Sequence, residues 1–256
     1  MRKIIIAISI LLASFSVTAG DSYTIVNAGS DSGDFKAVLS MIGNQVDSKF
    51  IQANNPVVAA SHFNNKNVLT MWSTEWPGDS SMPSVEMNEN TIIGIMTYET
   101  IMCSRTFTSM SDMSGKTIKI ATWGKSPPVK NFLDSVGKDN NINFVIVPYD
   151  GSGATIRGYL GNDTDTIFTS QTKQNKVEAD GKCFAFSANG DLDFAFVDVI
   201  VSINASKTAV NNARSVVAKL AQSEAWKTAF GGTMTYVINS GAITSKVNSA
   251  ISNFSN

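Results

Sequence analysis

Three small polar loops carry the residues of this chain that are best suited to holding a ligand. They span residues 27–34, 122–128 and 148–154, and each follows a predicted strand and precedes a predicted helix. Glycine lets the backbone approach a bound group closely, and the free N–H groups of a helix N-terminus attract anions. The loops therefore predict recognition of a small anionic or polar solute. The alternative is that their serines only cap the helices that follow.

The candidate ligand-binding residues lie in these loops, in a fourth loop at residues 73–78 and after a later strand. They are Ser30, Asp31, Ser32, Gly33, Asp34, Glu75, Trp76, Trp123, Gly124, Ser126, Tyr149, Ser152, Gly153, Ala154 and Gln171. Tyr149 can offer its ring and its hydroxyl group, and Lys125 is the one cation at the loop tips. The carboxylates could contact the ligand or only cap helices. Trp72, Trp76 and Trp123 follow strands, where they could form an apolar wall or belong to the core.

The elements that must position these loops alternate between strand and helix. Residues 23–72 and 117–168 each read as strand, helix, strand, helix, strand. Apolar residues at helical spacing predict a helix from residues 31–32 to Gly43, and another from Ser126 and Pro127 to Gly137. Residues 91–105 are strand-like throughout. This order favours an α/β fold with mostly parallel sheets, in which ligands bind beyond the carboxyl ends of the strands.

The composition excludes several classes of function. The chain has 256 residues, of which 43% are hydrophobic and 16% charged, and its net charge is -1. This length is enough for one large domain or for two lobes of ordinary size. The lack of a basic stripe argues against nucleic acid as a partner. A single histidine and two cysteines make a metal site improbable. The sequence contains no nucleotide-binding or hydrolase motif, so we expect no cofactor. The rival class is an exported enzyme that uses Tyr149 or His62 as acid or base; a structural or surface role is the alternative for His62.

The N-terminal residues predict export, which bears on the state of the two cysteines. Arg2 and Lys3 precede an apolar stretch at residues 4–17, and small residues follow up to position 19. This pattern is typical of a secretory signal, so the mature protein is expected to start at residue 20 or 21, outside the cytoplasm. The alternative is a membrane anchor. Two cysteines in an exported chain, Cys103 and Cys183, predict one disulfide, with two buried thiols as the alternative.

Four stretches of the sequence resemble one family of receptors. "TIKIATWGKSPPVKNFLD", "VIVPYDGSGATIRGYLGNDTDTIFTS" and "DGKCFAFSANG" resemble the second lobe of the Bug-type (TctC-like) solute receptors of tripartite tricarboxylate transporters. "YTIVNAGSDSGDFKAV" resembles the family's first strand and glycine-rich loop, which places Asp34 at the family's aspartate. The similarity covers most of residues 23–205, and the Val-Pro-Tyr-x-Gly stretch is its most specific part.

The resemblance implies a two-lobed, type II periplasmic-binding fold with hinge strands. We expect one lobe from residues 20–102 and 184–256 and the other from residues 103–183, with both cysteines on segments that pass between the lobes. A monomer in the periplasm would close around a small organic carboxylate and deliver it to membrane transporter subunits, without catalysis. The usual Pro-Gly-Gly of the first loop is Gly29-Ser30-Asp31 here. An amino acid or another small polar solute is therefore the alternative ligand.

Overall fold

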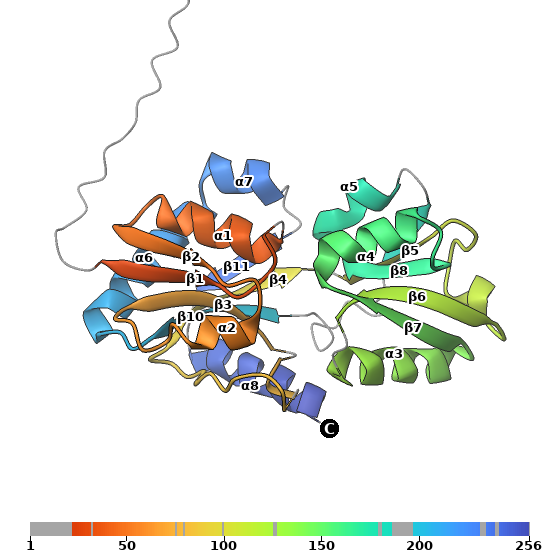
Figure 1. The fold of residues 1–256 in the computed structure, drawn as a ribbon, viewed down its shortest axis with the longest axis horizontal. Coiled ribbons are helices and arrows are strands. Elements are labelled where there is room, and N and C mark those ends of the chain that lie inside the picture. The colour runs from red at the N-terminus through yellow and green to blue at the C-terminus, as the bar shows by residue number, and fades with distance from the viewer. Residues whose placement is uncertain are drawn as a thin grey trace, which may run out of the picture.

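Two mixed β-sheets lie side by side and define two lobes (Figure 1). The computed structural model describes residues 22–255 except 32, 75, 79, 99, 125–126, 179–180, 186–196, 231–233 and 239–240. The first lobe holds a six-stranded sheet in the order β11-β4-β10-β3-β1-β2, and the second a five-stranded sheet in the order β7-β6-β8-β5-β9. The strands are β1 (Tyr23–Asn27), β2 (Ser48–Gln52), β3 (Val68–Ser73), β4 (Ile92–Tyr98), β5 (Thr100–Ser104), β6 (Thr117–Trp123), β7 (Asn143–Tyr149), β8 (Thr166–Ser170), β9 (Lys182–Ala185), β10 (Val197–Ile203) and β11 (Met234–Ile238).

Helices cover both faces of the first sheet. One face packs against α1 (Asp34–Gly43), α6 (Lys207–Ala221) and α7 (Glu224–Phe230), the other against α2 (Pro56–Ala60) and α8 (Gly241–Ser255). Side chains of β3 alternate between the two covered faces, so the whole strand is buried. Leu69 and Met71 enter one hydrophobic cluster, whereas Val68 and Trp72 enter the other.

The second lobe repeats this three-layer plan. The amphipathic helix α3 (Pro127–Asn140) covers one face of its sheet, and α4 (Gly151–Leu160) with α5 (Gln174–Val177) covers the other. Phe132 and Leu133 of α3 pack on Phe168 of β8 in one cluster, and Tyr159 of α4 packs in the opposite one. Three short 3-10 helices lie in the connections: η1 (Trp76–Gly78), η2 (Ser111–Met113) and η3 (Gln171–Lys173).

The structure corrects three expectations about these elements. Parallel pairing is confined to β2-β1-β3 and β7-β6-β8, and the other pairs are antiparallel, so the sheets are mixed. The single long strand expected at residues 91–105 is two strands, and the chain changes sheet between β4 and β5. Helix α3 continues past Gly137, where it was expected to end, to Asn140. Gly137 instead permits a close approach, since an added Cβ would lie 2.6 Å from the carbonyl oxygen of Ile142.

The predicted lobe boundaries fall inside strands. Residues 102 and 103 both belong to β5, and residues 183 and 184 both belong to β9, which are strands of the second sheet. The exact boundaries stay a prediction. Residues 1–21, which include the predicted signal, lie outside the described residues. Within the described part of the chain, no helix has the length and apolar character needed to cross a membrane.

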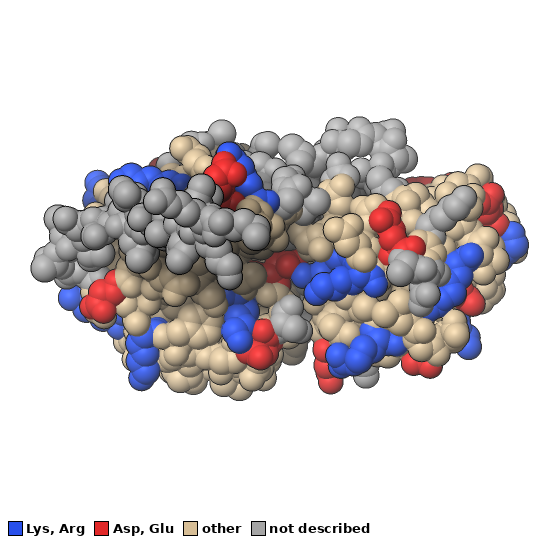
Figure 2. Space-filling view, turned by 90° about the horizontal axis from the view of Figure 1, so that it is seen from above, with Lys and Arg blue, Asp and Glu red and all other residues tan. Residues whose placement is uncertain are grey.

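Charge is spread thinly over the surface. On the face seen in Figure 2, charged side chains are scattered among neutral ones, and residues of both signs occur on each lobe. This distribution agrees with the net charge of -1 and the charged fraction of 16%. The face in view therefore offers no extended single-sign patch for nucleic acid.

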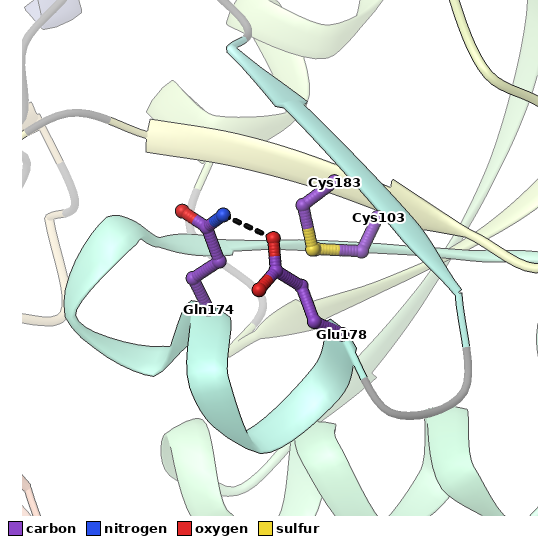
Figure 3. Close-up of a disulfide and its surroundings, with 4 residues drawn as sticks. All are labelled: Cys103, Gln174, Glu178 and Cys183. Carbon is purple, nitrogen blue, oxygen red and sulfur yellow. Dashed lines mark hydrogen bonds between the residues drawn. A yellow bond between two sulfur atoms is a disulfide. The ribbon is translucent and has the colours of Figure 1, made fainter.

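The predicted disulfide is present. Cys103 of β5 lies directly opposite Cys183 of β9 in the antiparallel register, with their Cα atoms 4.0 Å apart (Figure 3). Its position corrects the expectation that it would join segments passing between the lobes, because both strands belong to the second sheet. Nearby on α5 the side-chain amide of Gln174 donates to the carboxylate of Glu178. The disulfide therefore ties two neighbouring strands of one lobe.

Candidate functional site

A cavity of about 790 Å³ lies between the two lobes. The first lobe contributes the β1–α1 loop, residues 54–56 and η1, and the second contributes the β6–α3 loop, the β7–α4 loop and the end of β8. Ligand sites for small molecules commonly have volumes of roughly 300–1,000 Å³. The cavity thus has room for a small organic solute, at the carboxyl ends of parallel strands where sequence reasoning placed it.

The structure brings most of the predicted site residues together. Eight line the cavity: Ser30, Gly33, Asp34, Trp76, Trp123, Gly124, Tyr149 and Ser152. Four described residues do not line it: Asp31, Gly153, Ala154 and Gln171. Three lie outside the described residues: Ser32, Glu75 and Ser126. Asp31 instead forms an exposed ion pair with Lys36. A ligand-binding role for each of these residues stays a prediction.

The β1–α1 loop is held in shape by two amide side chains. The backbone N–H of Gly29 donates to Asn27 Oδ1 at 3.0 Å, and Gln52 Nε2 donates to the carbonyl oxygen of Gly29 at 3.0 Å. Asn27 Nδ2 also donates to Gln52 Oε1 at 2.9 Å. Sequence reasoning missed Asn27 and Gln52. They end neighbouring parallel strands in register, and an amide at both strand ends is the signal that could have found them.

Two long helices that begin at the cavity, α1 and α4, have no side-chain cap. The N-cap residues are Gly33 for α1 and Asp150 for α4, and neither makes a side-chain cap hydrogen bond. Both N-cap residues line the cavity. Since the first N–H groups of a helix have no partner within the helix, these groups are suited to hydrogen-bond a ligand. The helix start expected at residues 31–32 lies further on, because the N-cap of α1 is Gly33. The capping alternative is wrong for Ser152, because Ser152 lies inside α4.

Two other helices show what a side-chain cap looks like in this protein. Asn55 caps α2 by accepting from the backbone N–H of Val58 at 2.8 Å. Ser206 caps α6 by accepting from the backbone N–H of Ala209 at 3.1 Å. Side-chain caps therefore occur in this protein, whereas α1 and α4, which begin at the cavity, have none.

The lobes come close together at Gly151. This residue has a φ of +76°, a left-handed conformation that favours glycine. A Cβ added to Gly151 would lie 3.5 Å from the Cβ atom of Ser30 in the other lobe. A larger side chain at position 151 would therefore be strained and would press on the first lobe.

Tyr149 does not present its hydroxyl group as expected. Its ring packs on α4, where a Cβ added to Gly158 would lie 2.2 Å from Tyr149 Cζ. The hydroxyl donates to Asp163 Oδ2 at 3.4 Å. Burial raises the pKa of Tyr149, and the nearby carboxylate of Asp163 raises this pKa further. The phenol therefore stays neutral at ordinary pH, which makes it a poor general base.

The tryptophans divide between core and cavity. Trp76 and Trp123 line the cavity from opposite lobes, and their rings are backed by Trp72 at 4.7 Å and by Phe168 at 5.0 Å between centroids. Trp72 is fully buried in the first lobe, so the core alternative holds for it. His62 follows α2 and does not line the cavity.

The end of β8 supplies polar residues that sequence reasoning missed. Thr169, Ser170 and Lys173 line the cavity, and all three are buried. Asp150 and Asp198 line it as well, and neither was among the predicted site residues. The rule applied to the other strand ends, that polar residues after a strand face the crevice, would have flagged Lys173.

A polar contact joins the lobes beside the cavity. Lys173 forms an ion pair with Asp34 through Oδ1, and Thr172 Oγ1 donates to Asp34 Oδ2 at 2.8 Å. Asp34 begins α1 in the first lobe, whereas Thr172 and Lys173 belong to η3 in the second. We call these three residues the interlobe clamp. Among the described residues, no cluster of His, Cys, Asp and Glu side chains is arranged to hold a metal ion.

No protein-family model matches the chain, and no curated protein matches its sequence. Solved structures match along almost the whole length. A protein of R. palustris solved with adipate has a TM-score of 0.68 at 10% identity, covering 91% of this chain and 95% of that one. The periplasmic binding protein BugD has 0.65 at 11% identity, with 91% and 95% covered. MatC from Rhodopseudomonas palustris, with bound malate, has 0.63 at 10% identity, with 94% and 99% covered.

These similarities establish the fold. The chain has the two-lobed architecture of type II periplasmic binding proteins, with helices on both faces of each sheet. The fold predicted from sequence is confirmed in its two lobes and their helix-covered sheets.

Proposed function

We propose that this protein is an extracytoplasmic solute-binding receptor that captures a small organic carboxylate between its lobes. The observation that carries the proposal is the cavity between the lobes, which the uncapped N-termini of α1 and α4 approach from opposite sides. Backbone N–H groups and the partial positive charge of two helices are a fitting environment for a carboxylate. Binding would close the lobes around the solute. We propose no cofactor for this function.

The comparisons support the class of ligand. One similar structure contains adipate and another contains malate, both of which are small dicarboxylates. The resemblance of the glycine-rich loop and the Val-Pro-Tyr-x-Gly stretch to Bug-type receptors points the same way. We therefore propose that the chain is a receptor of this type, exported through residues 1–19 and working as a monomer. It would deliver its solute to membrane subunits of a tripartite tricarboxylate transporter.

An exported enzyme fits the site less well. Catalysis of this kind needs complementary titratable groups that converge on a substrate. Tyr149 directs its hydroxyl to Asp163, and His62 lies outside the cavity lining. Both residues favoured by the enzyme alternative are thus poorly placed for acid–base work.

The charges around the cavity favour a second candidate ligand, an amino acid. The described lining residues include three carboxylates, on Asp34, Asp150 and Asp198, but one lysine, Lys173. An ammonium group on the ligand would offset this excess of negative charge, while the ligand's carboxylate would still face the helix N-termini. Such a receptor would prefer a zwitterion to a plain dicarboxylate.

A matched pair of solutes separates the two candidates. Malate and aspartate share one dicarboxylate skeleton and differ by a hydroxyl against an ammonium group. We expect calorimetry of the mature protein to show binding of malate or adipate, and tighter binding of aspartate would favour the amino-acid candidate. Native mass spectrometry would identify any solute that copurifies. Binding of none of the three, with no copurified acid, would contradict the proposal.

Closure offers an independent readout. Trp76 and Trp123 line the cavity from opposite lobes, so bound solute should change the intrinsic fluorescence. Small-angle scattering should show a more compact particle at saturation, because the lobes approach each other about the hinge. A bound solute that changes neither signal would contradict capture by closure.

A further inference from the structure

Lys173 is an unusual residue to find at the wall of a solute cavity. Its side chain is 8% exposed, and its ammonium group pairs with Asp34, whose side chain is 19% exposed. A lysine this deeply buried needs a partner, because an isolated charge away from water is strongly unfavourable. Asp34 supplies that partner from the other lobe. The pair fixes where the ammonium group lies at the cavity.

The hydrogen bonds of the clamp leave the ammonium group with donors to spare. Each oxygen of Asp34 accepts one hydrogen bond, Oδ1 from Lys173 and Oδ2 from Thr172. An ammonium group carries three N–H donors. Among the described residues Lys173 has one acceptor, the Asp34 carboxylate, and Lys173 itself lines the cavity. Its remaining donors are therefore available to an acceptor inside the cavity.

We propose that Lys173 is the side chain that anchors the carboxylate of the captured solute, and that Asp34 acts as a positioning residue through Lys173. The inference rests on the proposed function and names the side chain that recognises the carboxylate in that site. It holds for a dicarboxylate and for an amino acid alike, since both carry a carboxylate. It also reassigns Asp34, which the sequence pattern had placed among the ligand contacts.

The neutral pairing explains why such an anchor suits a site with several carboxylates. Asp34 offsets the charge of Lys173 before any solute arrives, so the ammonium group is held in place without leaving a buried charge unpaired. A hydrogen bond between charged partners is about twice as strong as a neutral one. Its loss at a buried site corresponds to about a 10- to 100-fold weaker affinity.

The alternative is that the clamp only holds the lobes together. In that case Lys173 and Asp34 are equivalent halves of one latch, and removing either has the same effect on closure and on affinity. An anchor and its positioning residue are not equivalent. Loss of Lys173 removes the group that touches the solute, whereas in Asp34→Asn the amide oxygen can still accept a hydrogen bond from the ammonium group and hold it at the cavity wall.

The experiment uses the mature, oxidised protein and the best-binding member of malate, adipate and aspartate. We expect Lys173→Met to weaken binding about 10- to 100-fold, Asp34→Asn to weaken it far less, and Thr172→Val to cost less than about 3-fold. Lys176→Met is the matched control, because Lys176 is an exposed lysine on α5 and its loss should not change affinity. The double variant Asp34→Asn with Lys173→Met removes both charges, so no buried charge is left unpaired to disturb folding. This double variant should bind as weakly as Lys173→Met.

The outcomes separate this inference from the proposed function. If the wild-type protein binds none of the three solutes, the proposed function falls and the inference falls with it. If the wild type binds and Lys173→Met binds equally well, the inference alone is overturned. Equal losses in Lys173→Met and Asp34→Asn, with the same expansion of the particle by scattering, would show a latch between lobes and also overturn the inference.

Discussion

Reduction of the Cys103–Cys183 disulfide should destabilise the second lobe without disturbing solute capture. The bond joins residues 80 positions apart, and the loop it closes contains β6, α3, β7, α4, β8 and α5. Constraining a loop of this length in the unfolded chain stabilises the folded state by roughly 4 kcal/mol in the chain-entropy model. For a domain of this size, that corresponds to a fall in Tm of about 8–16 °C.

Affinity should change little, because of where the bond lies. Both cysteines belong to paired strands of the second sheet, so the bond spans no gap between lobes and can move with its lobe as the cavity closes. We expect the reduced protein to bind its solute within a few-fold of the oxidised protein. Thermal unfolding followed by circular dichroism, with and without reductant, measures the stability, and calorimetry measures the affinity.

Two controls make the result decisive. Thiol titration of the unfolded, unreduced protein should find no free thiol, because the described chain forms this disulfide. A Cys103→Ala and Cys183→Ala double variant should melt lower than the oxidised wild type and be insensitive to reductant. Complete reduction with no change in Tm would refute the stabilisation. A large loss of affinity in a folded, reduced protein would show that the bond positions the cavity.

Three further predictions concern single positions. Gly151→Val places a branched side chain at a φ of +76° against the first lobe. Binding should weaken at least about tenfold, while the backbone strain should cost only about 1–2 kcal/mol of stability. Unchanged affinity by calorimetry would contradict the close approach. Gly158→Ala should lower Tm, because the new Cβ displaces the Tyr149 ring. In a Tyr149→Ala background the same substitution should raise stability by roughly 0.5–1 kcal/mol through helix propensity. A stability change of the same sign in both backgrounds would count against the clash. The backbone N–H and the hydroxyl of Thr108 hold the pKa of Asp112 below its usual 3.8, so this carboxylate contributes stability above pH 3.8 that is lost as pH falls through its lowered pKa. Asp112→Asn should therefore be less stable than wild type at neutral pH, with a gap that narrows in acid.

Local pattern was enough to predict most of the elements around the cavity. The helical spacing of Phe35, Val38 and Ile42 marked α1, and Pro127 marked the first residue of α3. These signals are local, because helix periodicity and end chemistry depend on residues a few positions apart. The strand-to-helix loops could therefore be identified as the carriers of the site.

Sheet membership was beyond local pattern. Residues 91–105 look like one strand, yet β4 pairs in the first sheet and β5 in the second. The pairing partners of β5 lie in β8 and β9, far along the chain. The residues of a strand predict that the strand will be buried, but they do not predict which neighbouring strand will pair with it.

From the sequence by itself came the predictions of export, of a two-lobed α/β fold with polar loops at its strand ends, and of one disulfide; the structure confirms the two lobes and the disulfide. Only the tertiary structure decided which side chains of those loops meet. The Tyr149 hydroxyl donates to Asp163, whereas Lys173 pairs with Asp34, which lies 139 positions away in the chain. The reason is that burial and ion pairing depend on lobes brought together by the whole fold. Residue type shows that a lysine is able to bind a carboxylate. The surroundings of the lysine decide whether its ammonium group is held at the cavity.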